Sequence, residues 1–197
     1  MKSKNIENIE LAFLGLDDYQ ELKSAMIESY TTMPEAFWSK LQIESLIDKF
    51  PEGQVVIKIN DQIAGCALSI IVDHSTFDGF HTYRQITGNY SFSTHTQQGD
   101  TLYGIDVFIK PEFRGLRLGR MLYDYRKELC ERLNLKGVAF GGRIPNYHKY
   151  AHKLSPKEYI GKVRKKEIHD PVLNFQISND FHPSKILKNY LEGDDAS

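Results

Sequence analysis

The segment that decides the fold is Phe108-Ile109-Lys110-Pro111-Glu112-Phe113-Arg114-Gly115-Leu116-Arg117-Leu118-Gly119, where an apolar strand turns into a helix. The strand is predicted over 101–109, because Pro111 lacks the N–H that a ladder hydrogen bond needs. A helix is predicted over 118–133, because apolar residues recur there on one face at spacings of three and four. These residues are Leu118, Leu122, Tyr125, Leu129 and Leu133.

The turn between this strand and helix is suited to binding phosphate. It brings several free backbone N–H groups and the positive end of the helix dipole to one point. Arg114, Arg117 and Arg120 surround that point, where guanidinium groups can pair with phosphate oxygens. The sequence contains neither the GxxxxGK motif of a P-loop nor the GxGxxG motif of a dinucleotide fold. On spacing alone, the other interpretation is an ordinary turn with basic residues facing water.

Composition defines the broad class of the protein. The 197 residues carry 25 basic and 26 acidic side chains without a polybasic run, so neither nucleic acid nor a membrane is expected as a partner. The most apolar run, 63–72, is half of the roughly 20 residues that span a bilayer, and no signal peptide is recognised. Cys66 and Cys130 lack metal-ligand spacing, so no metal site is expected. We therefore expect a cytoplasmic protein with one domain over 1–197 and buried, reduced thiols.

The remaining elements follow from periodicity and helix caps. Strands are predicted at 9–14, 54–59, 63–72, 136–140 and 172–178, and helices at 17–30, 39–50, 145–153 and from Ser155 onward. The long insertion 73–100 is predicted to be an ordered, functional loop or hairpin, and the acidic tail 192–197 to be frayed. This order predicts a mixed α/β (α+β) domain with one twisted sheet covered by helices.

The segment 108–119 resembles the acyl-CoA-binding signature of the GNAT superfamily, which follows the fourth strand and runs Arg/Gln-x-x-Gly-x-Gly/Ala. Arg114 matches the first position and Gly119 the last. Arg117 stands where the first glycine belongs, and that glycine lets the backbone approach a pyrophosphate closely. The arginine therefore either lowers the affinity or supplies a new charge contact.

The resemblance extends from about residue 35 onward to a narrower subgroup, the GNAT domains fused in front of a nitrilase-type carbon–nitrogen hydrolase. It rests on the segments 51–54, 101–105, 141–150 and 170–172. It implies a twisted, mostly antiparallel sheet that is flanked by helices and splayed between strands four and five, at 101–109 and 136–141. It leaves open a homodimer and a functional link to such a hydrolase.

The resemblance also implies an activity: direct transfer of an acetyl or other short acyl group from acyl-CoA to a primary amine of a small molecule or peptide. The alternative is a non-catalytic acyl-CoA-binding module that regulates a carbon–nitrogen hydrolase. The residues implied in binding acetyl-CoA, or another acyl-CoA, are Val107, Phe108, Ile109, Arg114, Gly115, Leu116, Arg117, Leu118, Gly119, Arg120 and Asn146.

Two catalytic roles have candidates. Asp106 lies on the fourth strand and is predicted by alternation to face away from Val107 and Ile109, where it acts as general base or pairs structurally. Tyr150 is the candidate acid that protonates the departing thiolate, and Tyr147 is its rival; otherwise both are packing tyrosines. Phe37 and Trp38 either line the acceptor pocket or belong to the core, and His74, His81 and His95 are expected to be solvated.

Overall fold

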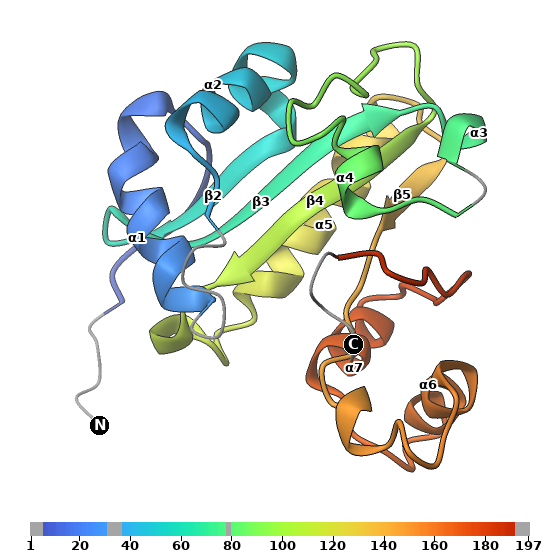
Figure 1. Cartoon of the computed structure of the whole chain (residues 1–197). Helices are drawn as coiled ribbons and strands as arrows, with labels where there is room; N and C mark the ends of the chain where they lie inside the picture. Colours follow the sequence, from blue (N-terminus) through green and yellow to red (C-terminus); the bar gives the residue numbers. More distant parts are fainter. Residues whose placement is uncertain (1–5, 31–36, 78–79, 192–197) are drawn as a thin grey trace. The chain divides into compact units, whose positions relative to one another are not determined.

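The computed structural model describes residues 6–30, 37–77 and 80–191 (Figure 1). The tail 192–197 lies outside these residues. The chain divides into two compact units, and each is described by itself. The first unit comprises residues 1–76 and 87–139, and the second comprises residues 77–86 and 140–197. None of the described helices is long and apolar enough to cross a membrane.

A five-stranded sheet organises the first unit. Its strands are β1 Ile9–Phe13, β2 Gln54–Ile59, β3 Gln62–Val72, β4 Thr101–Ile109 and β5 Gly137–Phe140, in the order β1-β2-β3-β4-β5. The first four pair antiparallel, and β5 follows parallel to β4. The turn from β2 to β3 uses Asn60 and Asp61, both at positive φ, as a two-residue hairpin requires. The predicted mixed α/β fold with a mostly antiparallel sheet is confirmed.

Helices cover both faces of this sheet: α1 Tyr19–Ser29 and α2 Lys40–Lys49 on one face, and α5 Leu118–Arg132 on the other (Figure 1). The start of α2 is fixed by a capping box, in which Ser39 accepts from the Gln42 N–H and Gln42 bonds back to Ser39. The apolar stripe of α5 buries Leu118, Leu122 and Leu129, as its spacing predicts.

Among its described residues, which leave out 78 and 79, the insertion 73–100 is a loop. It contains two four-residue helices, α3 His74–Phe77 and α4 Tyr83–Ile86, and no strand among its described residues. Phe92, a residue of this loop, is fully buried and packs as an apolar anchor in the first unit. The burial of Phe92 anchors this part of the connection.

In the second unit, the predictions for two segments are wrong. Residues 172–178 do not form a strand but lie in helix α7 Pro171–Ser178. Their apolar pattern suits a strand, but Asp170 caps the N–H groups of Val172 and Leu173 and Pro171 occupies the first helical position, which together start a helix.

The predicted helix over 145–153 is only a 3-10 turn at Tyr147–Lys149. Tyr150 leaves helical geometry, and the rings of Tyr147 and Tyr150 pack on Tyr159, so tertiary packing overrides the local preference. Tyr159 belongs to α6 Pro156–Arg164, which begins with the expected capping box of Ser155 and Glu158. With Val163 and Leu173 it forms the core of this unit.

Candidate functional site

The loop between β4 and α5 enters the left-handed backbone region at two residues. After a 3-10 turn at Pro111–Phe113, Gly115 has φ +88° and Arg117 has φ +61°. The left-handed region costs a side chain about 1–2 kcal/mol, which is why glycine is favoured there. Arg117 is therefore a non-glycine residue in a backbone conformation that favours glycine.

The start of α5 presents hydrogen-bond donors and positive charge. Arg117 is the N-cap residue, and no side chain caps the helix. The first N–H groups of a helix have no intrahelical acceptor, so they are open to an anion. Arg114, Arg117 and Arg120 are all exposed. Arg114 donates to the Ile109 carbonyl over 3.3 Å and Arg120 pairs with Asp124 over 3.5 Å, whereas Arg117 has no ion pair with any described residue.

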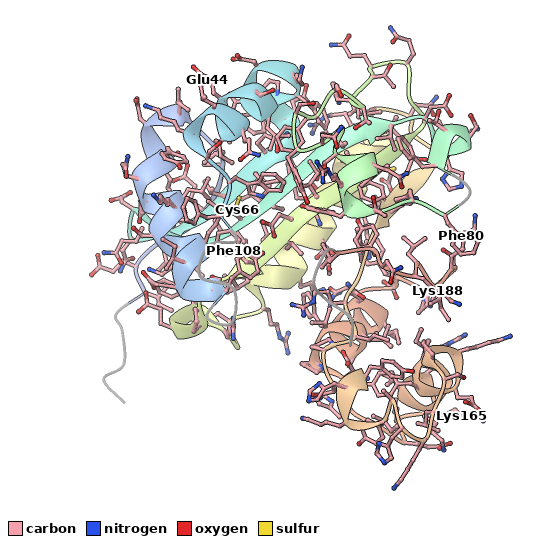
Figure 2. All side chains as sticks on the ribbon, in the orientation of Figure 1. Glu44, Cys66, Phe80, Phe108, Lys165 and Lys188 are labelled. Atoms are coloured by element: carbon pink, nitrogen blue, oxygen red, sulfur yellow. The ribbon has the colours of Figure 1, made fainter. Side chains whose placement is uncertain are left out.

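The residues of β4 that lead into this loop are divided between the two faces of the sheet, as alternation predicts. Val107 and Ile109 pack against the apolar cluster of Leu118 and Leu122. Phe108 makes an edge-on contact with the Tyr30 ring, at 5.9 Å between centroids, and lies opposite Cys66 in the β3–β4 register (Figure 2). The strand thus turns Phe108 toward α1 and its neighbours toward α5.

Asp106 lies on the α1 side, where two aromatic side chains hold its carboxylate. The Tyr30 hydroxyl donates to Oδ1, and the Trp38 indole Nε1 donates to Oδ2 over 3.2 Å. Burial raises the pKa of Asp106 above its usual range, and the hydrogen bonds from Tyr30 and Trp38 oppose this rise. A carboxyl whose pKa is raised and whose position is fixed has the properties of a general base near neutral pH.

The sequence does not mark Tyr30 as a site residue, because it lies 76 residues from Asp106 and has no local signature. Trp38 belongs to the core, one of the two roles left open for it. It is buried, with its ring 5.2 Å from that of Phe92, and it also touches the candidate base. His95, expected to be solvated, is instead stacked on Phe50 and accepts from the Ile71 N–H over 3.1 Å. Burial lowers the pKa of His95.

Three predicted site residues, Asn146, Tyr147 and Tyr150, belong to the second unit. The Tyr147 hydroxyl donates to the Leu154 carbonyl over 2.9 Å, whereas the Tyr150 hydroxyl has no hydrogen-bond partner among the described residues. A tyrosine with an uncommitted proton is the better acid, so this geometry favours Tyr150 over Tyr147. The Asn146 side chain donates to the His169 carbonyl and accepts from Lys149, bonds that hold the turn together.

The described residues include no group of three or more His, Cys, Asp or Glu side chains arranged to hold a metal ion. The loop after β4 leads into a basic helix N-terminus, and β4 itself carries a buried carboxylate. The helix N-terminus can bind an anion, and the carboxylate can accept a proton.

A family model described as the acetyltransferase (GNAT) family matches residues 22–154. The chain is 37% identical over 158 residues to the uncharacterized N-acetyltransferase YkwB of Bacillus subtilis (strain 168), a match that covers 80% of this chain and 70% of YkwB. It is 40% identical over 160 residues to the probable hydrolase YhcX of the same organism. That match covers 81% of this chain but 31% of YhcX, so the chain spans about a third of this relative's length.

Solved structures show the same fold at low sequence identity. The loading GNATL domain of CurA from Lyngbya majuscula superposes with a TM-score of 0.79 at 22% identity, covering 93% of this chain and 89% of that one. The GphF GNAT-like decarboxylase, solved in complex with isobutyryl-CoA, gives 0.80 at 17% identity, with 95% and 94% covered. At these identities, the similarity is one of fold.

Proposed function

This chain belongs to the acetyltransferase (GNAT) family, and from that premise we propose that it moves an acetyl or other short acyl group from acyl-CoA to a primary amine. The acceptor would be a small molecule or a peptide. The observation that carries the proposal is the left-handed backbone conformation of Arg117 at the start of α5, where no side chain caps the helix. It supports the interpretation that the acyl-CoA signature is functional here although its first glycine is missing.

In the proposed complex, the N–H groups at the start of α5 bind the pyrophosphate of acyl-CoA, with Arg114, Arg117 and Arg120 adding positive charge. The loop residues Gly115 and Leu116 and the first helical residues Leu118 and Gly119 complete this cradle. Backbone groups of 107–109 hold the pantetheine arm and polarise the thioester carbonyl. The acyl group would then lie beside β4, the strand that carries Asp106.

The proposed reaction is a direct transfer. Ionised Asp106 takes a proton from the attacking amine, directly or through one water, while the nitrogen lone pair forms a bond to the thioester carbon. The tetrahedral intermediate collapses with cleavage of the carbon–sulfur bond, and the leaving thiolate takes a proton from Tyr150. The products are an amide and free CoA thiol. Each carboxylate oxygen of Asp106 has two lone pairs, so the bonds from Tyr30 and Trp38 leave acceptor capacity for the amine proton.

The proposal is tested by following thiol release with acetyl-CoA and a panel of primary amines. Asp106→Asn should lower kcat about 100-fold or more, as loss of a positioned general base does. Asp48→Asn is the matched control, because Asp48 is an exposed carboxylate on α2, away from the proposed cradle. Saturable CoA binding without turnover on any amine would instead support the alternative, a non-catalytic acyl-CoA-binding module.

A finer proposal concerns the partner. Because this chain is 40% identical to about a third of a probable hydrolase, we propose that it acts together with a carbon–nitrogen hydrolase supplied by a longer chain or a separate protein. Size-exclusion chromatography with light scattering of the chain alone tests the homodimer, and repetition with the part of YhcX that lies outside the match tests the association. Elution of the two proteins only at their separate masses, at micromolar concentrations, would contradict the association.

A further inference from the structure

A β-bulge interrupts the pairing of β3 with β4 next to Asp106, and an arginine from α5 fills it. The register shifts between Leu68, which lies opposite Asp106, and Ser69, which lies opposite Gly104. A bulge leaves ladder groups without their usual partners. Here Arg126 Nη2 donates to the carbonyls of both Leu68 and Asp106, over 2.9 Å and 2.6 Å. One guanidinium therefore replaces the missing strand-to-strand hydrogen bonds.

The site around Arg126 is built to hold this side chain. Arg126 is 2% exposed, and its Nε donates to the Ser69 hydroxyl over 3.1 Å. A β-carbon at Gly104 would lie 2.8 Å from Arg126 Nη1, so only glycine leaves room for the guanidinium. None of its three acceptors is a carboxylate, and Arg126 has no ion pair within the part of the chain that the structure describes. A buried cation without an ion pair is costly, so packing alone does not account for it.

The carbonyl that Arg126 binds belongs to the peptide group that joins Asp106 to Val107. The C=O and N–H of one planar trans peptide point in opposite directions and share one delocalised electron system. A cation hydrogen-bonded to the C=O therefore draws electrons from the amide and makes its N–H a stronger donor. This N–H belongs to Val107 and acts to lower the pKa of the neighbouring Asp106 carboxyl.

We propose that Arg126 is a positioning residue that fixes the Asp106–Val107 peptide and strengthens the Val107 N–H as a donor to the thioester oxygen of acyl-CoA. The inference rests on the proposed function, in which the backbone of 107–109 polarises that carbonyl. Arg126 acts from the α5 face through the peptide group, whereas Asp106 acts from the α1 face through its side chain. A single peptide would thus link the oxyanion donor and the candidate base.

The test compares the wild-type protein with Arg126→Lys, Arg126→Gln and Ser69→Ala. Lysine keeps a positive charge, glutamine keeps only a neutral donor, and Ser69→Ala removes an Arg126 contact that lies outside the Asp106–Val107 peptide. The direct readout is the isotope-edited infrared band of the thioester carbonyl in bound acetyl-CoA labelled with carbon-13. Thermal unfolding and the Kd for CoA show that each variant is folded and loaded.

In the wild-type protein and in Ser69→Ala, binding should move the carbonyl band to lower frequency by the same amount. Arg126→Gln should lose most of this displacement and lower kcat by about 3- to 10-fold, with KM for acetyl-CoA within about 2-fold, because a donor is weakened and not removed. Arg126→Lys should keep part of the band displacement and part of the kcat that Arg126→Gln loses. An unchanged band and kcat in Arg126→Gln, with only a lower Tm, would overturn the inference and leave the proposed function intact. Absence of acetyl-CoA binding by the wild-type protein would overturn both.

Discussion

Replacing Arg117 with glycine separates the two properties of this residue, its strained backbone and its positive charge. Arg117 has φ +61° at the N-cap of α5, in a region that costs a side chain about 1–2 kcal/mol. Glycine removes this strain but gives the unfolded chain more freedom, which offsets about 0.5–1 kcal/mol. We therefore expect Arg117→Gly to stabilise the protein by about 0.5–1 kcal/mol. For a chain of this size, that is an increase in Tm of about 1–4 °C.

Arg117→Ala is the matched control, because alanine also lacks the guanidinium but keeps the β-carbon and so the strain. Differential scanning calorimetry should place the Tm of Arg117→Gly above that of Arg117→Ala by about 2–4 °C, a difference of about 1 kcal/mol. Equal Tm values for the two variants, or a higher value for alanine, would refute the interpretation that the loop holds a strained, glycine-like conformation.

Binding of CoA by the same two variants tests the charge. If the guanidinium contacts phosphate, Arg117→Ala should weaken the Kd for CoA by about 5-fold, the effect of one exposed ion pair. Arg117→Gly should bind more tightly than Arg117→Ala, since the backbone can approach the pyrophosphate more closely. An alanine variant that binds as well as the wild-type protein would contradict a charge contact from this arginine.

Three further predictions follow from the contacts of other residues. Asp170→Ala removes the side-chain cap of α7 and the acceptor of the Tyr159 hydroxyl, so it should destabilise the second unit by about 3 kcal/mol in urea unfolding, and Tyr159→Phe by about 1 kcal/mol. Burial lowers the pKa of His95 below its ordinary 6.5, so the unfolded chain binds the proton at a higher pH than the folded chain does. The free energy of unfolding should therefore fall as the pH drops below about 6.5, and it should fall less steeply in His95→Gln. Urea unfolding at pH 7.5 and 5.5 measures both. Tyr30→Phe removes a hydrogen bond that lowers the pKa of Asp106, so the acidic limb of the kcat/KM profile should move to higher pH; an unmoved limb would contradict Asp106 as the base.

The sequence predicts the parts of this protein that depend on local signals. Strand 54–59 and strand 101–109 are correct at both ends, because turn residues and Pro111 bound their apolar runs. The capping boxes at Ser39 and Ser155 place the starts of α2 and α6 correctly. The segment 172–178 shows the limit of periodicity, because the cap formed by Asp170 and Pro171 outweighs an apolar pattern that suits a strand equally well.

The candidate site depends on contacts that no local signal encodes. Asp106 is predicted as a candidate base from its place on the strand, but the aromatic residues that hold it come from 76 and 68 residues away. In the sequence, nothing distinguishes Arg126 from the other charged residues of an amphipathic helix. Its role depends on two backbone carbonyls, 58 and 20 residues away, that a bulge brings together. A bulge is set by the pairing of two strands, so neither strand's sequence predicts it alone.

Calorimetric titration of the protein with acetyl-CoA and with CoA shows whether the β4–α5 loop binds acyl-CoA. The wild-type protein is compared with an Arg114→Ala, Gly119→Trp double variant and with Arg132→Ala, which removes an arginine from the other end of α5. We predict saturable binding of both ligands to the wild-type protein and to Arg132→Ala, and loss of binding in the double variant at an unchanged fold. No binding to the wild-type protein at millimolar ligand, or equal binding to the double variant, would contradict the claim.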